Sequence, residues 1–529
     1  MTRGAMTLLL ALAIGLGMMG PAWAQDQAAA IAELKKEMRE LRQEVNKKQK
    51  QIEALENRLD AVQKTVNATP AKEPVQAATA KTEPATPQTA LDQAVEGPKA
   101  EKAKVGGSKP QEALDQAVKA VQAPQEPAKP GLLSYKVGGA TLKLLDVSFD
   151  LMAAGGTSTA TDRQMQTGLQ GGGHDPRKRG FTLQQAELSL TGAVDPYFNG
   201  ETHIVYFLDP ATGESQVELE EAFLTTQKLP YGLQAKAGTF LTEFGRINPT
   251  HPHAWKWLDQ PIINSRLFGP DGMRGPGFRV SWLTPLPWYS QLYFGMQNAN
   301  GSMTSLLSND GNVADRPIGG YPFFDRQVQT MRDLAYTARV ENSCDLSQTV
   351  TSKLGLSGVY GPNYTGLHGD TWIYGSDLLV KWRPAKNYQG WPYLLWESEI
   401  IGRTFRTLPL DMARVPSNIL RDIGFYSQLT WGFYPGWSVG VRGEYAGGVG
   451  RGVSLDAATG TFGFVSRNTD PFRDDRYRIS PVLTWQPSEF SRLRLQYNHD
   501  WAYHLPGKTA DTIWAGVEIM YGAHPAHKY

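Results

Sequence analysis

From Leu142 onward the chain alternates between polar and apolar residues with a period of two, in about 16 successive segments of roughly 8 to 14 residues. Such a period predicts β-strands with one polar and one apolar face. The alternation is clearest in residues 490–501, where Arg492 and Arg494 share one face while Leu493 and Leu495 share the other. The predicted strands are residues 142–153, 181–194, 200–208, 217–227, 232–240, 277–283, 288–297, 334–342, 350–360, 371–383, 391–403, 421–432, 437–447, 474–486, 490–501 and 511–521.

The connectors between these strands alternate between very short and long. Short ones such as residues 229–232 and 285–287 contain the Pro and Gly of tight turns. Short turns on one side and long loops on the other are typical of outer-membrane barrels. The longest connectors are residues 154–180, 241–276, 298–333, 404–420 and 448–473.

Only a closed sheet leaves no backbone polar group unpaired in lipid. We therefore predict an all-β fold over residues 133–529, a transmembrane antiparallel β-barrel of about 16 strands in the cell outer membrane. A water-soluble β-sandwich would show the same period and is the alternative. The membrane barrel is favoured by the aromatic residues near strand ends, which are Trp431, Trp437, Trp485 and Trp501.

The N-terminal part divides into three further segments. Residues 1–24 have the basic start, short apolar run and Ala-Trp-Ala ending of a signal peptide. Residues 25–66 carry apolar residues at heptad spacing, which predicts a coiled coil on the periplasmic side of the membrane. Residues 67–132 are rich in Pro and Ala and predict a disordered linker. A coiled coil implies a homo-oligomer.

Composition narrows the function. A net charge of +1 argues against nucleic acid as a partner. A single cysteine excludes an intramolecular disulfide. We find no nucleophile elbow, phosphate-binding glycine loop or Cys-x-x-Cys pair, so we expect neither an enzyme nor a cofactor.

The combination of signal peptide, coiled coil, linker and barrel resembles the phosphate-selective porin O/P family. The resemblance also rests on residues 217–224 followed by 233–238, and on the ending 521–529. It implies a porin, with a trimer favoured and with Tyr529 as a barrel assembly signal. The family's arginine ladder and lysine cluster cannot be placed residue by residue. The stretch 243–255 is similar to a branch described as TonB-dependent or zinc-regulated receptors.

In general porins the third long loop folds inward and narrows the pore, which points here to residues 241–276. The alternative is a loop packed on the outer rim. Mixed charge on the wall is the ordinary way a lumen is solvated. We therefore favour a general preference for anions over specificity for phosphate. The pore and selectivity candidates are Arg246, Lys256, Arg266 and Arg274 in this loop, and Arg476, Arg478, Arg492 and Arg494 on the wall.

Two histidines in the same loop are candidate metal ligands. His251 and His253 would bind one ion if a carboxylate such as Glu243 or Asp259 joined them. Two histidines alone are a weak signal, and solvated or hydrogen-bonded loop histidines are the favoured interpretation.

The favoured function is passive diffusion of small hydrophilic solutes or anions through a porin in contact with outer-membrane lipid. One alternative is a TonB-type receptor for a metal or metal chelate, which would need an N-terminal plug and about 22 strands. Another is an envelope tether that acts through the coiled coil.

Overall fold

The computed structural model describes residues 134–137, 140–143, 145–169, 171–209, 211–309, 311 and 317–522. The predicted signal peptide, coiled coil and linker all lie outside the described residues, which begin within the predicted barrel region at Ser134. Tyr529 also lies outside them.

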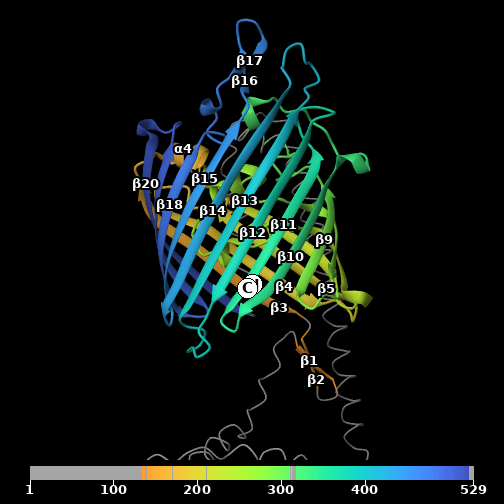
Figure 1. Ribbon diagram of the computed structural model, residues 1–529, viewed down its shortest axis with the longest axis vertical. Coiled ribbons are helices and arrows are strands. Elements are labelled where there is room, and N and C mark those ends of the chain that lie inside the picture. Colours follow the sequence, from red (N-terminus) through yellow and green to blue (C-terminus); the bar gives the residue numbers. More distant parts are fainter. Residues whose placement is uncertain are drawn as a thin grey trace, which may run out of the picture. The chain divides into compact units, whose positions relative to one another are not determined.

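Sixteen strands form one closed barrel (Figure 1), as the alternating pattern predicts. Each strand pairs in antiparallel fashion with its neighbours along the chain, and β20 pairs with β3 to complete the ring. The barrel strands are β3 (Asp146–Ser158), β4 (Gly180–Ala193), β5 (Phe198–Leu208), β6 (Ser215–Thr226), β7 (Leu233–Leu241), β8 (Arg274–Leu283), β9 (Tyr289–Asn298), β10 (Leu334–Ser347), β11 (Val350–Pro362), β12 (Asp370–Trp382), β13 (Tyr393–Thr407), β14 (Asn418–Tyr434), β15 (Trp437–Val449), β18 (Arg476–Ser488), β19 (Ser491–Ala502) and β20 (Thr509–Gly522).

Four further strands lie outside the barrel wall. β1 (Ser134–Val137) and β2 (Ala140–Lys143) form a hairpin before the barrel. β16 (Gly452–Asp456) and β17 (Thr461–Val465) form a second hairpin within the connector that we expected to be a loop. The helices are short: α4 (Asp162–Gln164) and α5 (Ile262–Phe268), with single turns at Met165–Leu169, Pro230–Gly232, Pro252–Ala254, Ile318–Gly320, Met331–Asp333, Arg467–Thr469 and Pro506–Lys508. Among the described residues, no helix has the length and apolar character needed to span a bilayer.

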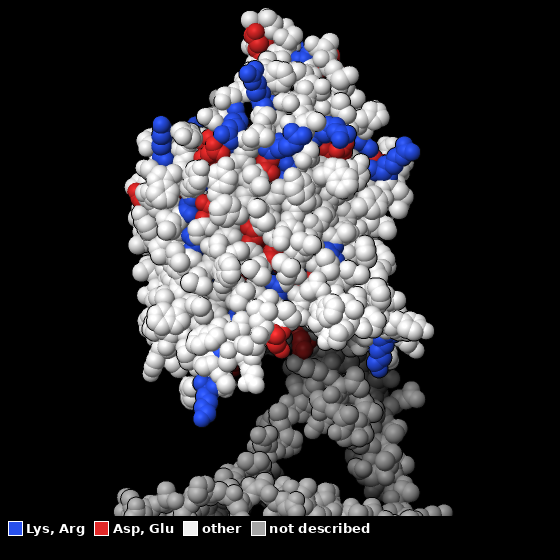
Figure 2. Space-filling model, in the orientation of Figure 1, with Lys and Arg blue, Asp and Glu red and all other residues white. Residues whose placement is uncertain are grey.

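The two faces of the wall differ in polarity as predicted. In β19, Arg492 and Arg494 are 8% and 3% exposed, while Leu493 and Leu495 are 41% and 48% exposed. Figure 2 shows that this face of the barrel is mostly free of charged side chains, which gather towards the end that carries the β16–β17 hairpin. An apolar outer surface and a charged interior are what a lipid-facing barrel requires.

A cation on the outer face is expected to weaken the barrel. Leu495→Arg near the middle of β19 is expected to lower the free energy of unfolding by about 2 to 4 kcal/mol, because the guanidinium would face hydrocarbon. Chemical unfolding in lipid vesicles measures this. Leu455→Arg is the matched control, because Leu455 is exposed on the β16–β17 hairpin. An equal loss in both variants would contradict a lipid-facing position for Leu495.

The connector between β7 and β8, residues 242–273, is called the inward segment below. It contains α5, whose seven residues are all buried. Gly269 ends this helix with φ +100, and a Cβ there would lie 2.8 Å from the carbonyl oxygen of Ser302, so glycine is required. Apolar residues of the segment pack with wall and loop residues in one buried cluster of Phe244, Ile262, Ile263, Leu267, Phe268, Met273, Ala299, Met303, Leu306, Leu307, Ala335, Val359, Ile373, Ile401 and Ala446.

Candidate functional site

The inward segment bonds to strands that lie far apart around the barrel. The Gly245 amide donates to Ser357 Oγ on β11 at 3.1 Å, and the Ile262 amide donates to Glu444 on β15 at 2.7 Å. The Leu258 amide donates to Gln496 on β19 at 2.7 Å. The partners on these strands are buried polar side chains that face inward. The segment therefore lies inside the barrel and not on its rim.

Asp259 is the charged centre of this attachment. Its carboxylate is 0% exposed and accepts from Arg442 at 2.5 Å and from Arg478 at 2.9 Å. Gln496 and Asn498 also donate to it, at 2.8 and 2.7 Å. Burial alone would raise the pKa of Asp259, but the two guanidinium groups outweigh it and lower this pKa to about 2. The segment thus carries an ionised carboxylate into a cluster of wall arginines.

The four predicted wall arginines do come together, but each is engaged. Arg476 and Arg478 share Asp500, with Nε to Oδ1 distances of 2.8 and 2.9 Å. Arg492 and Arg494 share Glu518. Arg494 also donates to the carbonyl oxygens of Trp255 and Trp257 at 3.0 and 2.9 Å. These side chains therefore hold the inward segment against β18–β20 as well as adding positive charge.

The four candidates from the third long loop do not form a single group. Arg246 pairs with Glu397 on β13 at 3.2 Å, and Arg266 donates to the Pro471 carbonyl oxygen at 3.3 Å. Arg274 begins β8 and pairs with Glu218. Lys256 is half-buried beside Trp257 in the segment. Each of the three arginines contacts a different element.

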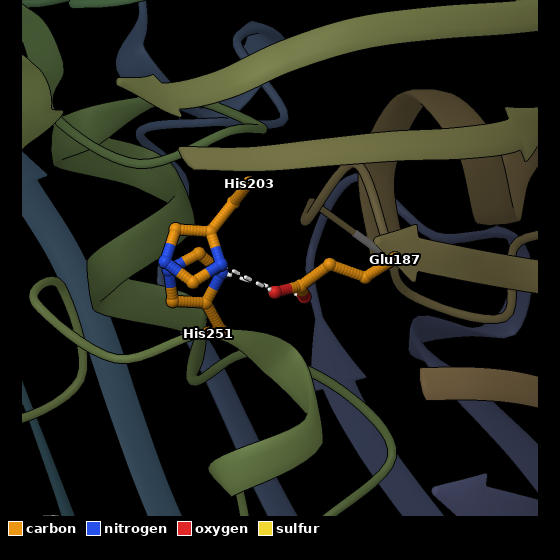
Figure 3. A group of neighbouring side chains, drawn as sticks. All are labelled: Glu187, His203 and His251. Atoms are coloured by element: carbon orange, nitrogen blue, oxygen red, sulfur yellow. Dashed lines mark hydrogen bonds and ion pairs between the residues drawn. The ribbon is translucent and has the colours of Figure 1, made fainter. Parts of the chain in front are cut away.

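A second polar cluster lies further around the wall, where the inward segment meets β4, β5 and β6. Figure 3 shows Glu187 of β4, His203 of β5 and His251 of the inward segment pointing towards one another. His203 Nδ1 lies 2.8 Å from Glu187 Oε1, and His251 Nδ1 lies 3.5 Å from Glu187 Oε2. The two imidazole rings have centroids 4.4 Å apart. All three side chains offer one ligand atom within 4.8 Å of the others.

Further carboxylates surround this cluster. Glu220 Oε2 lies 2.9 Å from His251 Nδ1, and Glu221 Oε2 lies 2.7 Å from His251 Nε2. Glu220 and Glu221 are consecutive yet both buried, because the pairing of β5 with β6 shifts register here and Glu220 has no strand partner. His253 Nδ1 contacts Glu187 Oε2 at 3.2 Å.

Glu243 and Asp259, named above as conditional partners of His251 and His253, lie elsewhere. Glu243 lies 3.3 Å from Arg279 and 3.7 Å from Lys236, and Asp259 is bound by wall arginines. Residues close in sequence to the two histidines therefore contact different strands of the barrel. Glu187 and His203, the partners that sequence analysis missed, occupy inward positions of predicted strands.

Comparisons with known proteins do not assign a function to this chain. No protein-family model matches the chain. An uncharacterized protein of Aquifex aeolicus (strain VF5) is 26% identical over 381 residues, which cover 68% of this chain and 73% of that protein. The resemblance to the phosphate-selective porin O/P family is therefore not confirmed and stays a hypothesis.

Several solved structures of outer-membrane proteins are similar to this chain. The outer membrane channel DcaP of Acinetobacter baumannii has a TM-score of 0.47 at 9% identity and covers 74% of this chain and 100% of its own. An anion-selective porin from Comamonas acidovorans has a TM-score of 0.39 at 9% identity, covering 72% of this chain and 99% of its own. OprB of Pseudomonas putida has a TM-score of 0.39 at 10% identity, covering 71% and 94%. Similarities this low do not carry the functional argument, which rests on the geometry above.

Proposed function

We propose that this protein is an outer-membrane porin through which small hydrophilic solutes diffuse passively. The observation that carries the proposal is the closed 16-strand barrel with apolar residues outside and charged residues inside. A barrel of this strand number leaves room for an aqueous channel between its wall and whatever folds inside. A TonB-type receptor is disfavoured because such receptors have about 22 strands.

The inward segment narrows the lumen in this proposal. Its hydrogen bonds to β11, β15 and β19 support a position across the barrel, so solutes would pass beside it. The residues proposed to set width and selectivity are Arg246, Lys256, Arg266, Arg274, Arg476, Arg478, Arg492 and Arg494.

Reconstitution of the purified protein in a planar lipid bilayer tests this function. Stepwise, ohmic current increments are expected, because a fixed aqueous pore conducts in proportion to voltage. Protein that inserts but gives no current steps at any voltage would rule out the porin.

The charge of the lumen favours anions. The wall from β15 to β20 carries one more arginine than the carboxylates that pair with it, and Lys256 adds to this excess. The neighbouring part of the wall, on β4–β6, carries acidic residues and histidines. A field across the lumen would let anions follow the basic side. The arginines are Arg442, Arg476, Arg478, Arg492 and Arg494, and the carboxylates are Asp259, Glu444, Asp500 and Glu518.

Lys256 makes this preference depend on pH. Burial, followed by weaker effects of neighbouring charges, lowers the pKa of Lys256 to about 8. Its ammonium is therefore charged below about pH 8 and neutral above it. The charged groups that act on it are Glu397, which favours the ammonium, and Arg492, Lys381 and Arg494, which oppose it.

We expect the anion preference, measured as the reversal potential across a salt gradient, to fall as pH rises through this value. Lys256→Gln should show the weaker preference at every pH. Lys508→Gln is the control, because Lys508 is exposed in the turn before β20. If the reversal potential of the wild type did not change with pH, and that of Lys256→Gln were the same, Lys256 would have no role in selectivity.

A homo-oligomer, with a trimer favoured, remains a prediction from the coiled coil and from the family resemblance. Attachment of the coiled coil to the cell envelope is compatible with porin activity. Both stay proposals, because residues 25–66 lie outside the described residues.

A further inference from the structure

The cluster of Glu187, His203 and His251 has the arrangement of a metal site. Both imidazoles turn the same nitrogen, Nδ1, towards the Glu187 carboxylate. The three residues come from β4, β5 and the inward segment, so the cluster joins the wall to the structure inside it. Nitrogen and carboxylate ligands in this combination suit first-row divalent transition metals.

The spacing of the ligand atoms fits a small tetrahedral ion. Zinc ligands at about 2.1 Å from the metal are about 3.4 Å from one another. The corresponding distances here are 2.8 Å for His203 Nδ1 to Glu187, 3.5 Å for His251 Nδ1 to Glu187, and 2.9 Å for His251 Nδ1 to Glu220. Glu220 lies next to the ligand nitrogen of His251 and is the candidate for a fourth ligand.

The other nitrogen of each imidazole is already held by a carboxylate. His203 Nε2 lies 2.9 Å from Glu201 Oε1, and His251 Nε2 lies 2.7 Å from Glu221 Oε2. Metal-binding histidines usually donate their second N–H to such a group, which fixes the tautomer and strengthens the ligand. The same outer arrangement is present on both histidines.

Two atoms facing the site form an ion-pair contact without a hydrogen bond. His251 Nδ1 and Glu220 Oε2 lie 2.9 Å apart, but neither makes a hydrogen bond within the described part of the chain. Glu220 is only 3% exposed, so an unbonded carboxylate oxygen there is costly. A cation between the two atoms would satisfy both.

The buried negative charge of the cluster also favours a bound cation. Glu187, Glu220 and Glu221 are three carboxylates buried within one cluster of histidines. Buried carboxylates need nearby positive charge, since an isolated buried ion is strongly disfavoured. A divalent ion would supply two positive charges at their centre.

We propose that Glu187, His203 and His251, with Glu220 as fourth ligand, bind a divalent first-row transition-metal ion. The ion ties the inward segment to the wall at β4–β6, a few strands around the barrel from its attachment through Asp259. Calcium and magnesium are excluded as preferred occupants because they take oxygen ligands. Zinc is the probe for the test.

The test measures zinc binding to full-length protein in detergent after removal of metal by a chelator. His524 and His527 are replaced by glutamine in every sample, because two histidines three residues apart could bind zinc by themselves. Calorimetry should give about one zinc ion per chain. His203→Gln and His251→Gln should abolish this binding, and Glu201→Gln should weaken it about 10- to 100-fold.

His504→Gln is the matched control, because His504 contacts a buried carboxylate, Asp474, at 3.0 Å away from this cluster. It should bind zinc as the parent does. X-ray absorption of the zinc-loaded parent should show two imidazole nitrogens, a result that does not depend on how the variants fold. Absence of stoichiometric binding, oxygen-only coordination, or equal binding by His203→Gln would each overturn the proposal. None of these measurements depends on pore conductance. The metal site and the porin function are therefore tested independently.

Discussion

Replacing residues 243–272 by a short Gly-Ser turn is expected to raise single-channel conductance several-fold. Leu241 and Arg274, which flank the inward segment, are already paired across β7 and β8, so a tight turn can join them. The wall would stay closed while its lumen lost the buried segment. A barrel of 16 strands without an internal obstruction is wide enough for an aqueous channel.

The same recording with residues 455–463 removed supplies the control. These residues form the exposed end of the β16–β17 hairpin, so their loss should leave the conductance unchanged. Unchanged conductance after removal of the inward segment, with circular dichroism showing an intact barrel, would mean that the segment does not limit the pore.

Asp259→Asn is expected to lower the free energy of unfolding by about 3 to 5 kcal/mol. Asparagine keeps the size of the side chain but removes the charge that compensates Arg442 and Arg478, and removal of one partner from a buried ion pair has a cost of this order. The heat-dependent shift in gel mobility should occur at a lower temperature. Current traces should also become noisier, because the inward segment loses its strongest attachment.

Asp475→Asn is the comparison for this effect. Asp475 pairs with Arg467, whose side chain is 32% exposed, so its loss should have a cost of no more than about 1 kcal/mol. Similar losses in both variants would show that Asp259 has no special place in the attachment.

The period of two was sufficient to predict the barrel because burial on one face constrains every strand in the same way. Residues 490–501 match β19, and the connector rhythm correctly located the short turns. The β16–β17 hairpin was missed because it lies beyond the wall, where polar and apolar positions no longer separate lumen from lipid.

The cluster of Glu187, His203 and His251 could not be predicted from the sequence. Strict alternation places Glu220 and Glu221 on opposite faces, whereas the register shift opposite His203 turns both inward. The position of His251 depends on how a 32-residue connector folds inside the barrel, which no local pattern encodes. A signal did exist: Glu187 and His203 are inward-facing on consecutive predicted strands.

The pairing of β20 with β3 has a consequence for the order of assembly. Ser158 bonds to Thr512 at 2.8 Å across this seam, a separation of 354 residues. One edge of β3, the first barrel strand to be synthesised, therefore stays unpaired until β20, the last, has been synthesised. Contacts this distant in sequence form slowly, and until they form both edges can pair with the wrong neighbour. The barrel can therefore close only after the whole chain has been synthesised.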